Sequence, residues 1–211
     1  MPLDPSRLLL YLVADPDLVD SDLLAMVTEA IEGGVTCVQL RAKGRTDREV
    51  ERLAGAMAVT CRDRGVLSLV NDRVDIALAC GADGVHLGVD DLSIEAARRL
   101  GGDRLVVGYS PETDEQAARA VARGADYLGV GPVFATGSKA DAGLPIGVDG
   151  LRRRITAAGL PAVGIGGITA ENASVVTGAG ASGVAVVSAI SRAAEPRAAA
   201  RALRAAVVGG R

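Results

Sequence analysis

The 211-residue sequence has few aromatic side chains and a single histidine, His86. It contains no tryptophan, three tyrosines and one phenylalanine, so it lacks the aromatic surfaces on which single-stranded nucleic-acid binders stack bases. One histidine excludes metal centres built from several histidines, and it disfavours a Ser/His/Asp triad. Chemistry that depends on stacking or on histidine clusters is therefore not expected.

An excess of charge of one sign is also missing. The chain has 23 Lys and Arg against 26 Asp and Glu, a formal net charge of -3, and no long basic run. Such a weakly acidic chain is a poor binder of polyanions. We therefore expect no nucleic-acid partner and no membrane-surface partner.

Cysteine is scarce as well. The three residues, Cys37, Cys61 and Cys80, are odd in number and far apart in the sequence. This pattern disfavours a disulfide framework and suits a reducing compartment. The sequence therefore predicts a cytoplasmic protein.

Long hydrophobic segments are few. Residues 8–14 follow Arg7 like a short signal core, but Asp15 ends the run and no small-residue cleavage site follows. Residues 172–191 are uncharged and long enough to span a bilayer, yet they contain three glycines among Asn, Ser and Thr. We interpret both segments as buried parts of an α/β fold.

One pattern repeats along the chain: a short run rich in Val, Leu and Ile, a polar or glycine turn, an amphipathic stretch, and a stop containing glycine. Apolar runs without strict alternation are typical of parallel strands covered on both faces. The predicted strands are 9–14, 35–40, 66–70, 84–87, 104–108, 126–130, 161–165 and 183–187. Eight such units predict a single-domain α/β protein, a (β/α)8 TIM barrel spanning residues 1–211, with a doubly wound open sheet as the alternative.

Polar side chains follow most of these strands, at the carboxyl ends where such barrels carry their chemistry. In chain order they are Gln39, Arg41, Lys43 and Arg45, then Asn71, Asp72 and Arg73, then Asp91, Ser110, Thr136 to Lys139, Gly166–Gly167 and Ser188. The loop 131–149 is long for a compact domain, which is typical of functional or mobile loops. The sequence predicts a site for a charged ligand at this rim.

Two of the rim loops suit a phosphate group. Gly166–Gly167 lets the backbone approach an anion closely, and Val187–Ser188 leads into the last part of the chain, where exposed N–H groups and a helix dipole attract negative charge. These are the loops that usually bind phosphate in this architecture. Taken alone, the Gly-Gly pair fits a simple tight turn equally well.

Asp72 and Asp91 follow neighbouring strands, so their carboxylates can share one divalent cation. Oxygen ligands without Cys or His suit Mg²⁺, which keeps waters and binds ligand phosphates. In the alternative interpretation, Asp72 caps a helix and Asp91 is a solvated loop charge.

Lysine is rare: Lys43 and Lys139 are the only two among 23 basic residues, and both fall on the predicted rim. An ammonium is a compact point charge, whereas a guanidinium is a planar fork, so the choice matters at a phosphate. The alternative is two solvated loop lysines. We expect His86, at the end of the fourth strand, to be a hydrogen-bonded histidine of a barrel layer rather than a catalytic base.

Five motifs occur in a fixed order. They are Gln39–Leu40–Arg41–Ala42–Lys43, Asn71–Asp72–Arg73, Gly84–Val85–His86–Leu87–Gly88 with Asp91, Gly129–Val130–Gly131–Pro132–Val133–Phe134, and Gly164–Ile165–Gly166–Gly167–Ile168. In this order, between about residues 9 and 192, the sequence resembles the thiamine phosphate synthase family.

This resemblance implies an enzyme that joins 4-amino-2-methyl-5-hydroxymethylpyrimidine diphosphate to a thiazole phosphate, forming thiamine phosphate and releasing diphosphate. Matching the family's pyrimidine-diphosphate site are Gln39, Arg41, Lys43, Asn71, Ser110 and Lys139, with Leu40 and Ala42 in the same segment. Matching its Mg²⁺ ligands are Asp72 and Asp91. Matching its thiazole-phosphate site are Thr136, Gly137, Ser138, Gly167, Val187 and Ser188. The resemblance implies catalytic roles for Lys139, Ser110, Arg41 and Lys43.

The sequence departs from the family pattern at several positions. Ala42 stands where the family often has Glu, Val89 where Gln is frequent, and Ser138 where a second Thr is usual. Ser138 keeps a hydroxyl, so we expect its phosphate contact to survive. Tyr109 precedes Ser110 where a smaller residue is common, and Pro111–Glu112 replaces a pair that often ends in His. The sequence therefore does not define the shape of the site around residues 109–112.

The residues leave three other functions open. A thiazole tautomerase-like isomerase would share the fold and the thiazole-phosphate site. A non-catalytic phosphate-ligand-binding barrel would bind without turnover, and a Schiff-base aldolase would use Lys139. The sequence leaves open whether the thiazole substrate is carboxylated and whether the chain forms a homo-oligomer.

Overall fold

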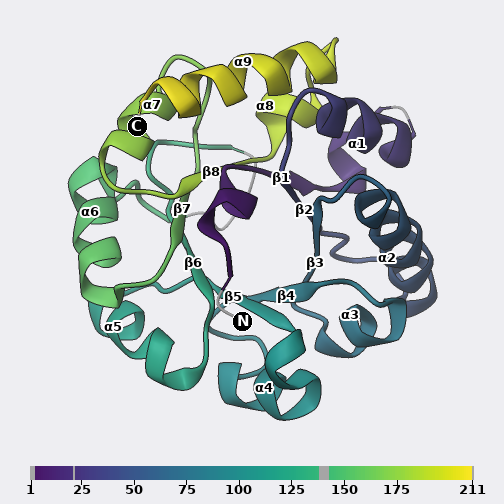
Figure 1. The fold of residues 1–211 in the computed structure, drawn as a ribbon, viewed down its shortest axis with the longest axis horizontal. Coiled ribbons are helices and arrows are strands. Elements are labelled where there is room, and N and C mark those ends of the chain that lie inside the picture. Colours follow the sequence, from purple (N-terminus) through teal and green to yellow (C-terminus); the bar gives the residue numbers. More distant parts are fainter. Residues whose placement is uncertain (1–2, 21, 138–142, 211) are drawn as a thin grey trace.

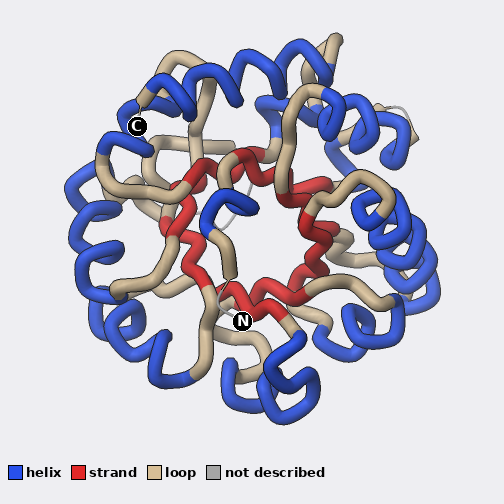
Figure 2. The backbone as a smooth tube through the Cα atoms, viewed as in Figure 1, coloured by secondary structure: helices blue, strands red, loops and turns tan. Residues whose placement is uncertain are grey.

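Eight parallel strands close into a barrel, with helices forming the outer ring (Figures 1 and 2). The computed structural model describes residues 3–20, 22–137 and 143–210. The strands are β1 (Leu10–Ala14), β2 (Cys37–Leu40), β3 (Leu67–Asn71), β4 (Gly84–Leu87), β5 (Val106–Tyr109), β6 (Tyr127–Val130), β7 (Ala162–Ile165) and β8 (Gly183–Val186). They lie in sequence order around the barrel, and β8 pairs with β1. The predicted (β/α)8 barrel is confirmed.

The helices follow the strands in the order the repeat predicts. They are α1 (Leu23–Glu32), α2 (Asp47–Arg62), α3 (Val74–Cys80), α4 (Ile94–Gly101), α5 (Asp114–Arg123), α6 (Gly147–Ala158), α7 (Ala173–Gly178), α8 (Ser188–Ser191) and α9 (Pro196–Gly209). In the described part of the chain there are also the 3₁₀ turns η1 (Pro5–Leu8), η2 (Pro16–Leu18) and η3 (Gly102–Arg104). Within the described ranges, no helix is both long and apolar enough to cross a bilayer.

Six strands begin one or two residues later than the apolar pattern predicts, and for two of them, β2 and β3, the physical reason is the same. Val35 was expected in the second strand, but its N–H bonds back to Ala30 O at 3.2 Å and closes the end of α1. Val66 likewise donates to Cys61 O at 3.0 Å at the end of α2. An apolar residue after a helix stop is buried by either arrangement, so hydrophobicity alone cannot locate the strand start.

The barrel has two apolar layers. The larger layer fills the space between strands and helices, and the smaller one fills the barrel interior, where Leu8, Tyr11, Leu67 and Tyr127 are almost completely buried. The N-terminal segment crosses the middle of the barrel in Figure 1, and η1 runs directly into β1. This segment therefore closes the end where the strands begin, which leaves the carboxyl end for a ligand.

Capping boxes end two of the rim loops. Thr46 and Glu49 cap α2 reciprocally, and Thr113 and Gln116 cap α5 in the same way. Such boxes satisfy the first free N–H groups of a helix and fix where it starts. The loops after β2 and β5 are thereby held short between a strand end and a fixed helix start.

Gly108 provides the space for the Tyr127 ring inside the barrel. A Cβ built on Gly108 would lie 2.2 Å from Tyr127 Cζ. We expect Gly108→Ala to lower the free energy of unfolding by about 1–3 kcal/mol, because overpacking forces side chains or backbone to shift. Thermal and urea unfolding followed by circular dichroism measure this change.

The matched control is Gly55→Ala in the middle of α2. There an added Cβ has its nearest neighbour, Cys80 Sγ, at 3.9 Å, so the helix gains about 0.5–1 kcal/mol from the less flexible residue. Equal stability of the two variants would contradict the packing argument.

Candidate active site

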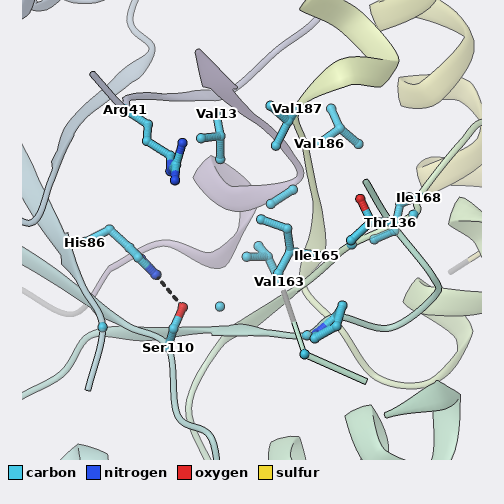
Figure 3. A pocket seen from close by; sticks show the side chains of 18 of the residues that line it. Val13, Arg41, His86, Ser110, Thr136, Val163, Ile165, Ile168, Val186 and Val187 are labelled. Carbon is cyan, nitrogen blue, oxygen red and sulfur yellow. Dashed lines mark hydrogen bonds between the residues drawn. The ribbon is translucent and has the colours of Figure 1, made fainter. Parts of the chain in front are cut away.

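A cavity of about 950 Å³ opens at the carboxyl ends of the strands. The side chains labelled in Figure 3 line it and come from β1, β4, β7 and β8 and from the loops that follow β2, β5, β6, β7 and β8. The sequence-predicted residues that line it are Gln39, Arg41, Lys43, Asn71, Asp91, Ser110, Thr136, Gly137, Gly167, Val187 and Ser188. Residues from seven separate loops or strand ends thus meet around one space.

Some predicted residues lie elsewhere. Leu40 is 1% exposed and belongs to the outer core, and Ala42 packs against that same core. Their side chains point away from the cavity because neighbouring residues of a strand face opposite sides. Ser138 and Lys139 lie outside the described residues.

Two carboxylates meet beside the cavity. Asp91 Oδ2 accepts the Gly88 N–H at 2.6 Å, and Asp72 lies beside Asp91 with Lys43 Nζ 3.3 Å from its Oδ2. Burial and the adjacent Asp91 carboxylate raise the pKa of Asp72, and the Lys43 ammonium opposes that rise. Two like charges held together are stabilised by a cation, so this arrangement suits one.

Asp72 also has an uncommon backbone conformation. Its φ is +62°, and it is the one described residue other than glycine with a positive φ. Asp and Asn adopt this backbone region more readily than most residues, but the conformation still costs free energy. Residues held in such conformations are concentrated at functional sites. The turn carries the Asp72 side chain from the end of β3 toward Asp91.

The described rim cations differ in what they contact. Arg41 lines the cavity while its Nη1 donates to the buried Asp15 carboxylate at 2.6 Å. Lys43 is half exposed. Arg45 and Arg73, expected on the rim, pair instead with Asp17 and with Asp47 and Asp75. Arg41 and Lys43 are therefore the described predicted cations placed to meet an anion.

The far side of the cavity is built from backbone. Gly166 and Gly167 have φ values of +98° and +64°. A Cβ on Gly167 would come within 2.4 Å of Ala135 O, so only glycine fits this approach of the two loops. Asn172 Nδ2 donates to Gly167 O at 3.0 Å and holds the turn. Thr136 and Ser188 place hydroxyls on the same cavity.

The sequence did not point to two further arginines that line the cavity, Arg154 and Arg192. Arg154 is 11% exposed and donates to Pro111 O at 3.2 Å and to Glu112 O, so it braces the wall after β5. On sequence alone Arg154 sits in a run of three arginines on a helix, which is typical of a solvated face. Tyr109 lies in the outer core, so that departure from the family pattern does not reach the cavity.

His86 is fully hydrogen-bonded, as expected. Its Nε2 lies 2.8 Å from Ser110 Oγ, the contact drawn in Figure 3, and its Nδ1 lies 2.8 Å from Tyr127 Oη. Tyr127 and Tyr11, which the sequence analysis did not single out, join this polar cluster beneath the cavity.

The chain is similar to known proteins over this whole region. A family model described as thiamine monophosphate synthase matches residues 10–190. The thiamine-phosphate synthases of Moorella thermoacetica and Haloarcula marismortui are each 51% identical to it, over 86% of both chains for the first, and over 88% of this chain and 90% of the relative for the second. The solved thiamine phosphate pyrophosphorylase from Pyrococcus furiosus has a TM-score of 0.89 and 38% identity, and the match covers 98% of both chains. The similarity therefore extends from β1 to α8, the elements that build the cavity.

Proposed function

The chain belongs to the thiamine monophosphate synthase family, and we propose that its rim cavity joins a pyrimidine diphosphate to a thiazole phosphate with release of diphosphate. The chain is an enzyme of the transferase class, and its activity is thiamine phosphate synthesis. The observation that carries the assignment of the site is the cavity itself. It has carboxylates and cations on one side and a glycine-built anion cradle on the other.

Asp72 and Asp91 fit a divalent cation. Two neighbouring carboxylates, one of them with its pKa raised by burial and by the other, are a donor set for a hard cation. A pair of carboxylates suits Mg²⁺, an ion that keeps waters and takes further ligands from substrate phosphates. When bound, Mg²⁺ supplies neutralisation of the negative charge on the diphosphate.

Arg41 and Lys43 hold the diphosphate of the pyrimidine substrate. Their positive charges face the cavity from the loop after β2, and they stabilise the charge that grows on the diphosphate as its bond to the pyrimidine methylene breaks. The family resemblance adds Lys139 to this group. The pyrimidine amino group supports the cation left at the methylene, so departure of diphosphate needs no covalent nucleophile from the chain.

The opposite side positions the second substrate. Gly167, Thr136 and Ser188 bind the thiazole phosphate, and Val187 contributes apolar surface. The thiazole nitrogen is then aligned with the pyrimidine methylene, and alignment is what this step requires. The absence of a strong base from the mechanism agrees with a histidine whose two ring nitrogens are both engaged.

The test is product formation from the purified chain. We expect thiamine phosphate and diphosphate, measured by mass spectrometry and phosphate release, only when both substrates and Mg²⁺ are present. Chelation with EDTA should abolish turnover, and added Mg²⁺ should restore it, because Asp72 and Asp91 alone repel the diphosphate.

The other outcomes are distinct. Binding of both substrates by calorimetry without product would favour a non-catalytic barrel. Rearrangement of a thiazole phosphate without the pyrimidine substrate would favour an isomerase. Comparing the plain and the carboxylated thiazole phosphate in the same assay identifies the preferred substrate. Small-molecule partners, a cytoplasmic location and a homo-oligomeric state stay predictions that accompany this proposal.

A further inference from the structure

We propose that a one-way chain of hydrogen bonds inside the barrel fixes Ser110 as a hydrogen-bond donor toward the cavity. Its members, in order, are Gln39, Tyr11, Tyr127, His86 and Ser110. His86 and Tyr127 are then positioning residues that act through Ser110. The direction of these hydrogen bonds is independent of the reaction, whereas their effect on turnover rests on the function proposed above.

The contacts are continuous across the barrel interior. Gln39 Nε2 donates to Tyr11 Oη at 2.6 Å, and Tyr11 Oη lies 3.0 Å from Tyr127 Oη. Tyr127 Oη lies 2.8 Å from His86 Nδ1, and His86 Nε2 lies 2.8 Å from Ser110 Oγ. The path runs from β2 through β1, β6 and β4 to the residue after β5, and both of its ends line the cavity.

The first bond sets the direction. An amide N–H can only donate, so Tyr11 Oη accepts from Gln39 and must pass its own proton elsewhere. Tyr127 Oη is the remaining partner of Tyr11 Oη among the described residues. Tyr127, having accepted from Tyr11, gives its proton to His86 Nδ1.

The last two bonds follow from the histidine. With Nδ1 accepting, the neutral imidazole carries its proton on Nε2. This N–H donates to Ser110 Oγ, which leaves the Ser110 proton free to point into the cavity. The opposite tautomer would push protons back along the chain and leave the buried Tyr11 O–H without an acceptor, which proteins avoid.

Burial keeps the two tyrosines protonated, as the chain of hydrogen bonds requires. Tyr11 and Tyr127 are 1% and 0% exposed, and burial raises the pKa of both hydroxyls well above the ordinary value. Both hydroxyls therefore keep their proton, and each accepts one hydrogen bond and donates one. Gly129 keeps the last bond open, because a Cβ there would lie 3.0 Å from His86 Cε1 and 3.2 Å from Ser110 Oγ.

The consequence is chemical. Diphosphate oxygens and pyrimidine ring nitrogens accept hydrogen bonds, so a hydroxyl that must donate recognises them, whereas one that must accept would not. A donor fixed in advance costs no reorientation when charge develops on the leaving group.

The single histidine makes the direction measurable. Nitrogen-15 NMR of the uniformly labelled protein shows the ring nitrogens of a single imidazole, that of His86. At pH 8 and without substrate, we expect Nε2 to have the shift of a protonated ring nitrogen and Nδ1 that of a bare one. A spectrum with the proton on Nδ1 would overturn the proposal.

Reversal of the chain is the sharper test. In Gln39→Glu, with ionisation of the new side chain confirmed by its infrared carboxylate bands, the carboxylate can only accept, so Tyr11 turns its proton toward it and the histidine proton should move to Nδ1. In the double variant Gln39→Glu with Tyr127→Phe the link is cut, and the carboxylate should no longer change the shifts found for Tyr127→Phe alone. An unchanged tautomer in Gln39→Glu, or an equal response with and without the Tyr127 hydroxyl, contradicts a continuous chain.

Kinetics connect the chain to the site. We expect Ser110→Ala to lower kcat about 10²-fold, as loss of one preorganised donor does, and Tyr127→Phe to lower it about tenfold, as loss of a supporting hydrogen bond does. The KM for the thiazole phosphate should stay within about twofold in both, since a merely loosened barrel would raise it. A full kcat in folded Tyr127→Phe would show that Tyr127 does not position Ser110. A wild-type protein that has the expected tautomer but no turnover would instead contradict only the proposed function.

Discussion

Replacement of Asp72 by asparagine is expected to lower kcat at least 10²-fold while the chain remains folded. The variant removes one of two neighbouring carboxylates at the edge of the cavity, and with it half of the anionic charge proposed to bind the cation. Lys43 loses its ion-pair partner at the same time. Steady-state rates over a range of Mg²⁺ concentrations measure both effects, and the Mg²⁺ requirement should rise.

Asparagine is the informative substitute because of the backbone. Asp72 has a φ of +62°, a conformation that Asn adopts almost as readily as Asp, whereas Ala would add strain of its own. Asp72→Gly, which relieves the strain and also removes the carboxylate, should be as inactive as Asp72→Asn. Asp103→Asn, an exposed aspartate in η3, is the matched control and should retain full activity. Wild-type turnover in Asp72→Asn would overturn the role of the carboxylate pair.

The fold followed from the sequence because its signal is repeated eight times. Runs of Val, Leu and Ile mark each strand, and the observed strands lie within about two residues of the predicted ones. Differences such as Val35 and Val66 arise where the last turn of a helix and a strand compete for the same N–H group. Periodicity reports burial, and both outcomes bury the side chain.

The rim residues were found for a topological reason. Parallel strands end on one side of a barrel, so Gln39, Asn71 and Ser110 meet although they are far apart in the chain. The same reasoning does not say which residues of a segment face the cavity, and the Leu40 side chain, which alternates with its neighbours, lies in the outer core. Proximity in sequence to a functional residue therefore says little about which way a side chain points.

The polar interior could not be predicted from the pattern. Tyr11 and Tyr127 stand inside apolar runs and carry no local sign that their hydroxyls meet. Their pairing depends on the register of β1 and β6 across the barrel. Arg154 was missed for a similar reason, since only the packing of α6 against the loop after β5 turns it inward.

Arg41→Met should combine a loss of activity with a loss of stability. Arg41 faces the cavity and is anchored to Asp15, with a 2.6 Å contact and only 22% and 8% of the two side chains exposed. Without the guanidinium, the diphosphate loses a preorganised positive charge, and we expect kcat/KM for the pyrimidine substrate to fall at least 10²-fold. The buried carboxylate is then left without its partner, which costs about 1–3 kcal/mol of unfolding free energy.

A second substitution separates the two effects. Adding Asp15→Asn to Arg41→Met removes the unpaired carboxylate, so urea unfolding should return toward the wild-type midpoint while kcat/KM stays low. Arg45→Met is the matched control, because Arg45 lies four residues further on, pairs with Asp17 and is not among the residues that line the cavity. Recovery of activity together with stability in the double variant would mean that Arg41 only holds the loop in place. Recovery of stability alone means that the Arg41 charge acts on the substrate, because activity that had been lost through misfolding would have returned with the fold.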